Sequence, residues 1–213
     1  MKKQFLSILT VTLLAACGET ENSNTNTQQV SADTQSLQQP AQQTNPLMTA
    51  MHTMMQDMQS MEMSGNMDKD FAMLMKRHHQ SAIDMANYEL QSGSDTTMRN
   101  MAEMIIEKQN KENEQLERII AATSATKNTD TTFATQSKQM MDNSHAQSMS
   151  VSMTGNADRD FAAMMVPHHQ SAIDMAQLYL KQGKNAELKR MAQMMVADQQ
   201  KEIQELNQWL QSR

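Results

Sequence analysis

The sequence predicts an all-α protein from three observations. Apolar residues recur at three- and four-residue spacing over long segments, runs of aromatic and β-branched residues are absent, and the glycines of the repeats stand at breaks between segments. The expected fold is an antiparallel four-helix bundle built from two tandem helical hairpins, with short Met-rich helices packed alongside.

The two hairpins follow from an internal duplication with an offset of ninety residues. Residues 68–86 read DKDFAMLMKRHHQSAIDMA and residues 158–176 read DRDFAAMMVPHHQSAIDMA, with fourteen of nineteen positions identical. The recurrence continues on both sides, from Gly65 to Gly155 and from Glu112 to Glu202. The chain therefore holds two copies of one unit.

Each copy predicts one short helix followed by two long ones. Ser64 to Asn66 breaks the first helix, and Asn66 or Asp68 can cap the second. The expected ranges are 47–62, 68–93 and 95–122 in the first copy, and 137–151, 158–183 and 185–211 in the second.

The residues ahead of the repeats predict export. Lys2 and Lys3 precede a short apolar run that ends in Leu-Ala-Ala-Cys, which resembles a bacterial lipoprotein signal and implies lipid attachment at Cys17. An ordinary signal peptide with a chance cysteine is the alternative. The polar segment that follows is typical of a disordered tether. The expected organisation is a signal peptide over 1–16, the lipidated Cys and tether over 17–46, a first repeat over 47–122, a linker over 123–136 and a second repeat over 137–213, with 47–213 as one folded unit. We expect a protein of the periplasm or cell envelope that contacts a membrane only through the lipid.

The composition limits the classes of partner and metal ligand that we expect. Asp and Glu number 24 against 18 Lys and Arg, and no basic cluster stands out, which argues against nucleic acid. Cys17 is the only cysteine, so the repeats form no disulfide and offer no thiolate. A soft metal ligand in the repeats must therefore be Met.

The repeated segments concentrate such ligands around a His-His pair. On a helix the two imidazoles flank the centre of the buried stripe, and because neighbouring residues diverge, the pair serves two ions or two partner helices. The first candidate ligands are Met75, His78, His79 and Met85, and Met165, His168, His169 and Met175.

A second group of candidates rests on the excess of methionine. After the signal there are 24 Met against 21 Leu, Ile and Val together, and His145 stands where the first copy has Met55. His145 is one helical turn from Met141 and Met149. The further candidates are Met51, Met55, Met101, Met104, Met141, His145, Met149, Met191 and Met194. A purely structural Met core is the alternative, since Met fills cores well.

The ligand types indicate the metal. Thioethers suit Cu(I), imidazole also accepts copper, and Ag(I) is similarly soft. Zinc would ask for thiolates or for several His and carboxylates. The Glu-x-x-His motif of di-iron bundles does not occur in the chain.

The tandem Met-x-x-His-His-Gln-Ser-Ala-Ile-Asp-Met-Ala segments resemble the signature of the domain of unknown function 305 family. The resemblance covers 47–120 and 137–211 and implies a ferritin-like helical bundle, export and copper binding through the Met and His residues of the two segments. The family usually has Pro before His-His. Pro167 conforms, whereas Arg77 departs from the pattern.

The function we expect is that of an exported copper-binding protein that buffers or stores Cu(I) or Ag(I), or passes it to a copper-transfer partner. The sequence shows no nucleophile–base set, phosphate loop or paired catalytic acid, so we expect no enzyme. The alternatives are a helical adaptor lipoprotein with a structural Met-rich core, and a Cu(I) oxidase.

Overall fold

The computed structural model describes residues 45–126 and 132–213, and these form helices without any strand. The helices are α1 (Pro46–Ser60), α2 (Met67–Ser92), α3 (Thr96–Ala122), α4 (Thr132–Met149), α5 (Ala157–Gln182) and α6 (Ala186–Gln211). The predicted signal peptide, Cys17 and nearly all of the predicted tether lie outside the described residues. None of the described helices is long and apolar enough to cross a membrane.

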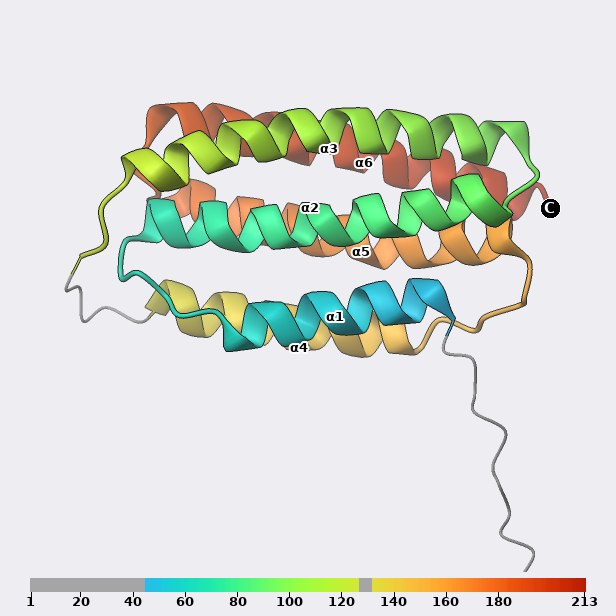
Figure 1. Ribbon diagram of the computed structural model, residues 1–213, viewed down its shortest axis with the longest axis horizontal. Helices are drawn as coiled ribbons and strands as arrows, with labels where there is room; N and C mark the ends of the chain where they lie inside the picture. Colours follow the sequence, from blue (N-terminus) through green and yellow to red (C-terminus); the bar gives the residue numbers. More distant parts are fainter. Residues whose placement is uncertain (1–44, 127–131) are drawn as a thin grey trace, which may run out of the picture. The chain divides into compact units, whose positions relative to one another are not determined.

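The helices lie in three layers of two (Figure 1). The hairpin partners α2 and α3 pack together, as do α5 and α6, and α2 packs against α5. Helices α1 and α4 contact each other and pack on α2 and α5, on the side away from α3 and α6. The predicted all-α fold of two tandem hairpins with short Met-rich helices alongside is confirmed, and α2 and α5 form its centre.

The predicted linker over 123–136 is too long. Helix α4 begins at Thr132, five residues ahead of the expected start, while the other helices begin within two residues of their expected positions. Phe133 explains the difference, because its ring is 6% exposed and packs into the core. Phe133 is the one large apolar residue among threonines and alanines, so the sequence shows no apolar periodicity that would predict the first turn of α4.

Short polar side chains fix where the long helices begin. Asn66 accepts the backbone N–H groups of Asp68 and Lys69 at the start of α2, and Asn156 accepts that of Arg159 at the start of α5. These bonds satisfy N–H groups that have no partner within the helix. Asn66, rather than Asp68, is therefore the cap.

Asp68 and its equivalent Asp158 instead join the two repeats. Asp68 Oδ1 accepts the Tyr179 hydroxyl at 2.6 Å and the Lys184 backbone N–H at 2.9 Å, in the turn between α5 and α6. Asp158 Oδ1 accepts the backbone N–H groups of Ser94 and Asp95, both at 2.8 Å, in the turn between α2 and α3. Each repeat thus holds the turn of the other with one carboxylate, and α2 and α5 are clamped at both ends.

Glu89 makes the contact between Asp158 and the turn joining α2 and α3 depend on pH. Glu89 stands where the second repeat has Tyr179, is fully buried, and lies so close beneath Gly93 that a Cβ at that position would clash with its carboxyl group. Burial, followed by the neighbouring Asp158 carboxylate, raises the pKa of Glu89 to about 8. A protonated Glu89 therefore lies beside an ionised Asp158, whose pKa is lowered: burial opposes that shift, but the N–H donors of Asp95 and Ser94 outweigh it.

We predict that Glu89→Gln abolishes a specific pH dependence of stability. Between pH 4.5, where the unfolded side chain titrates, and about pH 8, the folded chain keeps a proton that the unfolded chain has lost. The free energy of unfolding therefore falls as the pH rises through this window. Gln is uncharged and keeps an N–H donor, so the variant should lack this slope and exceed the wild type in stability at pH 9. Thermal unfolding at pH 6 and pH 9 measures it. The exposed Glu103→Gln is the control, and equal slopes in wild type and Glu89→Gln would contradict the prediction.

Candidate metal centre

The two repeats meet at a pair of imidazoles. The ring centroids of His78 on α2 and His168 on α5 are 3.8 Å apart, with the rings tilted by 38°. His78 Nε2 lies 2.7 Å from the Ser171 hydroxyl, which itself donates to the backbone carbonyl of His168. Since that hydroxyl has one proton, it accepts from His78. His78 therefore carries its proton on Nε2, which leaves a free lone pair on Nδ1.

The second histidine of each pair points to a different helix. His79 Nε2 is 2.8 Å from Glu112 Oε2 on α3, and His169 Nε2 is 2.9 Å from Glu202 Oε2 on α6. Glu112 and Glu202 are equivalent positions of the duplication. The neighbouring imidazoles of one pair thus face two partner helices rather than one common point.

The four imidazoles are more deeply buried than expected. The helical pattern placed them at the edges of a buried stripe, yet none is more than 1% exposed. Helix α2 is covered by α1, α3 and α5, and α5 by α2, α4 and α6, so the stripe is wider than one contact face. Arg77, Gln80 and Asp84, on the other side of α2, are exposed.

All four Nδ1 atoms are buried and lack a hydrogen-bond partner among the described residues. A buried polar atom without a partner typically costs about 1–3 kcal/mol, so four of them are a large burden for an ordinary core. In three of the four rings Nε2 lies against a carboxylate or hydroxyl oxygen. Only His78 Nε2 makes a hydrogen bond; Nε2 of His79 and of His169 lies close to a carboxylate oxygen without one, and Nε2 of His168 has no partner among the described residues. Metal-binding histidines commonly have one ring nitrogen next to an oxygen and the other on the ion, and His78, His79 and His169 have such an oxygen nearby.

The electrostatics favour the neutral imidazole that a metal requires. Burial, and then the neighbouring imidazoles, lower the pKa of His78 and of His168 well below the usual value. The pKa of Glu202 is lowered as well: burial would raise it, but contacts with His169 and Lys108 outweigh burial. The centre therefore combines two neutral rings, those of His78 and His168, with an ionised carboxylate next to His169.

The predicted methionine ligands fall into three layers. In the central layer Met75, Met85, Met165 and Met175 are all buried beside the histidines on their own helices. In the α3–α6 layer Met101 and Met191 are buried, but Met104 and Met194 are 59% and 56% exposed. In the α1–α4 layer Met51, Met55 and Met141 are buried, His145 is half-buried and Met149 is exposed. Together with the four central histidines these are the seventeen predicted ligands, and the structure does not bring them into one cluster.

Oxygen and nitrogen ligands alone do not complete a site. No group of three or more His, Cys, Asp or Glu in 45–126 and 132–213 is arranged to hold a metal ion. An ion at the central imidazoles must therefore accept a low coordination number or take thioether ligands. Both conditions suit a soft monovalent ion.

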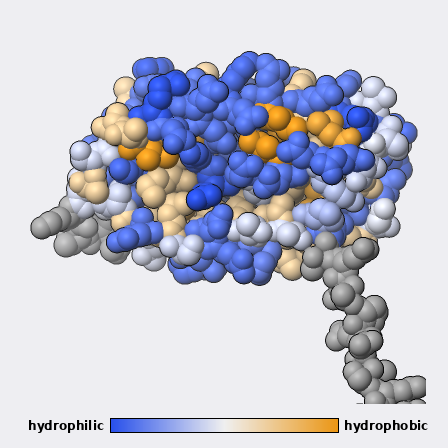
Figure 2. All heavy atoms as spheres, in the orientation of Figure 1, coloured by the Kyte–Doolittle hydropathy of each residue, from blue (hydrophilic) through white to orange (hydrophobic). Residues whose placement is uncertain are grey.

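A groove between α3 and α6 leads towards the buried rings. It has a volume of about 490 Å³, and its lining includes Met104, Met194, Glu112 and Glu202. Lys108 crosses it, with ion pairs to Asp198 at 2.9 Å and to Glu202 at 3.0 Å. The two exposed methionines and the two carboxylates that touch the buried histidines thus share one surface depression. The face drawn in Figure 2 is mostly hydrophilic, with hydrophobic atoms in small groups.

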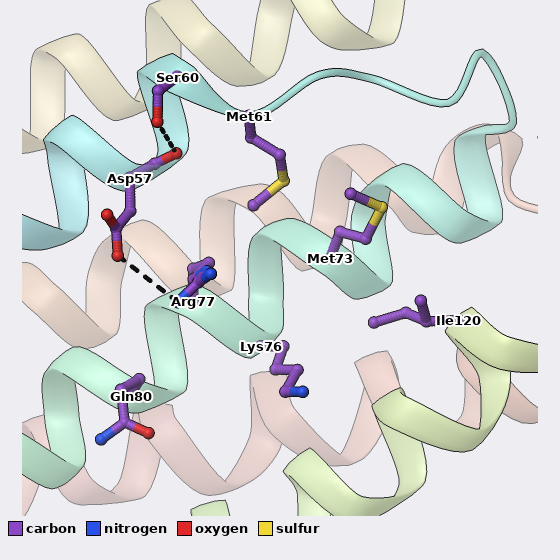
Figure 3. A pocket seen from close by; sticks show the side chains of 8 residues that line it. All are labelled: Asp57, Ser60, Met61, Met73, Lys76, Arg77, Gln80 and Ile120. Atoms are coloured by element: carbon purple, nitrogen blue, oxygen red, sulfur yellow. Dashed lines mark hydrogen bonds and ion pairs between the residues drawn. The ribbon is translucent and has the colours of Figure 1, made fainter.

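A second hollow, of about 470 Å³, lies between α1, α2 and α3 (Figure 3). Met61 and Met73 extend into it, and Arg77 reaches Asp57 across its side at 3.5 Å. It contains no imidazole, and none of the predicted ligands lines it. Its charged groups are paired with each other or with neighbours, so we assign it no metal.

Sequence reasoning missed the oxygen partners of the histidines. The recurrence of Glu112 at Glu202 was visible, but recurrence does not reveal which helix a side chain faces. Ser171 was not recognised either, because the sequence does not show which helix its hydroxyl faces. Its equivalent in the first repeat, Ser81, makes a different contact, 4.0 Å from the sulfur of Met51. His52 was missed for a simpler reason: its equivalent position is Asp142, so the duplication did not draw attention to it.

The model of the family described as "Domain of unknown function (DUF305)" matches residues 12–120 and 121–210. Among curated proteins, no sequence matches this chain.

Solved structures with the same fold include metal complexes. CopM in the Cu(I)-bound form has 25% identity and a TM-score of 0.52, over 68% of this chain and 96% of that one. CopM in an Ag-bound form has 26% identity and a TM-score of 0.52, over 68% and 95%. A DUF305 fragment from Deinococcus radiodurans, at 23% identity and a TM-score of 0.52 over 69% and 97%, shows the fold alone.

We predict that the variant Glu112→Gln/Glu202→Gln weakens metal binding at the centre while the helices persist. Loss of the negative charge next to Nε2 of His79 and His169 should lower the affinity for Ag(I) by about 10–100-fold. Competition titration measures the affinity, and circular dichroism measures helicity. Glu117→Gln is the matched control, because that exposed carboxylate on α3 pairs with Lys76 and touches no histidine. An unchanged affinity in the double variant would show that the carboxylates do not orient ligands.

Proposed function

The chain belongs to the DUF305 family, and we propose that it is a copper-binding protein which holds Cu(I), and also Ag(I), on imidazole and thioether ligands. The proposed role is to buffer, store or hand on the ion rather than to catalyse a reaction. The similarity to CopM, solved with Cu(I), Cu(II) and silver, supports copper at a coarse level. The assignment of ligands rests on the geometry of this chain.

The observation that carries the proposal is the set of four buried Nδ1 atoms without hydrogen-bond partners. A structural role for His78, His79, His168 and His169 would leave a buried nitrogen of each ring without a hydrogen bond, which is unfavourable. Coordination to an ion uses them. Because the His78 and His168 rings are in contact, an ion cannot lie between their faces and must bind at the ring edges.

The buried thioethers next to the histidines favour Cu(I) and Ag(I) over Zn(II). Met75 and Met85 flank the pair on α2, one helical turn before and about two turns after it, and Met165 and Met175 do so on α5. All four sulfur-bearing side chains are buried with the rings. Neutral sulfur and imidazole stabilise Cu(I) and Ag(I), whereas Zn(II) favours thiolate, several imidazoles or carboxylates.

The groove between α3 and α6 is the proposed route for the ion. Met104 and Met194 are exposed there, where a soft ion from solution or from a partner protein can first bind. Glu112 and Glu202 lie along the same groove and contact His79 and His169. An ion can thus pass from exposed thioethers to the buried rings along side chains of α3 and α6.

We place this function in the cell envelope, on the basis of the sequence ahead of the repeats. Phe5 to Ala16 is a short apolar run behind two lysines, and Cys17 follows Leu-Ala-Ala. Lipid on Cys17 would tether the helices to a membrane while leaving them in the aqueous compartment.

We predict that the protein takes Cu(I) or Ag(I) far more tightly than Zn(II), and that replacing all four central histidines by Gln removes part of that capacity. Gln preserves polarity and helix propensity but is a poor soft-metal ligand. Anaerobic competition with a chromogenic Cu(I) chelator measures both proteins. Displacement of copper by equimolar zinc would contradict the proposal. Equal copper binding by the variant would show that the rings are structural and that methionines alone hold the ion.

For the anchor, we predict that Cys17→Ser releases the protein from the membrane without altering its helices, because Cys17 lies well ahead of Pro46, where α1 begins. Membrane fractionation of producing cells measures the release, and circular dichroism of the purified variant measures the helices. A variant that still sediments with the membrane would refute lipidation at Cys17.

A further inference from the structure

The layer formed by α1 and α4 carries the two histidines that the central site does not use. The chain has six histidines, and four of them lie at the centre. The remaining two, His52 on α1 and His145 on α4, come from different repeats and are brought together by the contact between these helices. His52 is exposed and His145 is half-buried, so this pair borders solvent.

The separation of the two rings is that expected across a metal ion. Metal–nitrogen bonds of about 2 Å on each side, plus roughly 1.1 Å from each nitrogen to its ring centre, place two centroids about 6 Å apart in a near-linear arrangement. The His52 and His145 centroids are 6.2 Å apart, with the rings tilted by 44°. The centroids of His78 and His168, at 3.8 Å, are too close for an ion between them.

The ring nitrogens of this pair are in a state to bind. His145 Nδ1 is buried and has no hydrogen-bond partner within the described residues. His52 Nε2 is 2.9 Å from the side-chain nitrogen of Gln56 on the same helix. Since an amide N–H donates, Nε2 is the acceptor and carries a lone pair. An ion has to displace only this one solvent-exposed hydrogen bond.

Thioethers stand one helical turn away on both helices. Met48 precedes His52 by four residues and is half-buried, and Met149 follows His145 by four residues and is 47% exposed. The nearby Asp142 is paired with Lys138 at 3.2 Å. The donors left for an ion are therefore imidazole and sulfur, which favours a soft cation over a hard one.

We infer that His52 and His145 form a second copper site, which bridges the two repeats at the solvent-facing side of α1 and α4. This inference rests on the proposed copper function but concerns a different pair of residues. The site is open to solution, whereas the central imidazoles are enclosed. An ion from solution therefore reaches it faster than the central imidazoles, and it ties α1 to α4 when occupied.

The test is a titration of the full chain with Ag(I), a soft monovalent ion without redox chemistry, followed by nuclear magnetic resonance of the histidine rings. Directly after each substoichiometric addition the His52 and His145 signals should shift together in a first, fast phase, and the central four should follow more slowly. His52→Gln and His145→Gln should each weaken this phase by at least roughly tenfold. The double variant should be no weaker than either single one, because both rings serve one ion.

The central variant His78→Gln/His168→Gln is the matched control and should keep this first phase. Single-variant effects that multiply in the double variant would mean two independent sites and would overturn the bridge. Silver that binds while the His52 and His145 signals stay unmoved would refute this inference and leave the proposed function standing. Absence of silver binding by the wild type would refute both.

Discussion

The contact between α2 and α5 is the constraint on which the rest of the structure depends. The two helices are copies of one sequence, and Asp68 and Asp158 clamp each of them to the far turn of the other repeat. Such reciprocal bonds make the helices run antiparallel and place equivalent positions opposite one another. A single imidazole per copy thereby becomes the pair of His78 and His168 at the middle of the contact. The duplication itself creates the centre.

That contact also dictates what the other layers must supply. With one imidazole of each pair facing the opposite repeat, its neighbour is turned by about 100° towards the hairpin partner. A buried polar ring there favours a carboxylate nearby, and Glu112 on α3 and Glu202 on α6 lie within 2.8 and 2.9 Å of the two rings. The carboxylates in turn need partial access to water or a cation, which the groove and Lys108 provide. Polar chemistry thus extends from the centre to the surface on one side of the central layer.

Periodicity and duplication were enough to predict the helices, the hairpins and the burial of most methionines, because these depend on local sequence and on one apolar stripe per helix. They could not predict the partners of the imidazoles, since these depend on how helices pair. Glu112 was recognised only as a repeated position. The fourth helix began early because Phe133 buries its ring, a tertiary effect absent from local composition. His52 gained significance only when α1 and α4 were found in contact.

The two copies agree at the centre and differ around it. The differences pair Met55 with His145, His52 with Asp142, Arg77 with Pro167 and Glu89 with Tyr179. The matching residues lie across α2 and α5, where each copy must fit the other. Met55 and His145, and His52 and Asp142, lie on α1 and α4, and Arg77 is exposed. Tyr179 instead stacks on Phe71 of α2 at 4.2 Å, so one difference lies within the central contact. An ion at the proposed centre would therefore be surrounded by two similar halves, while an ion at the proposed site on α1 and α4 would be bound by unlike ones. Enclosure and symmetry in the centre suit retention, whereas an exposed, unequal pair of rings suits exchange with solution or a partner.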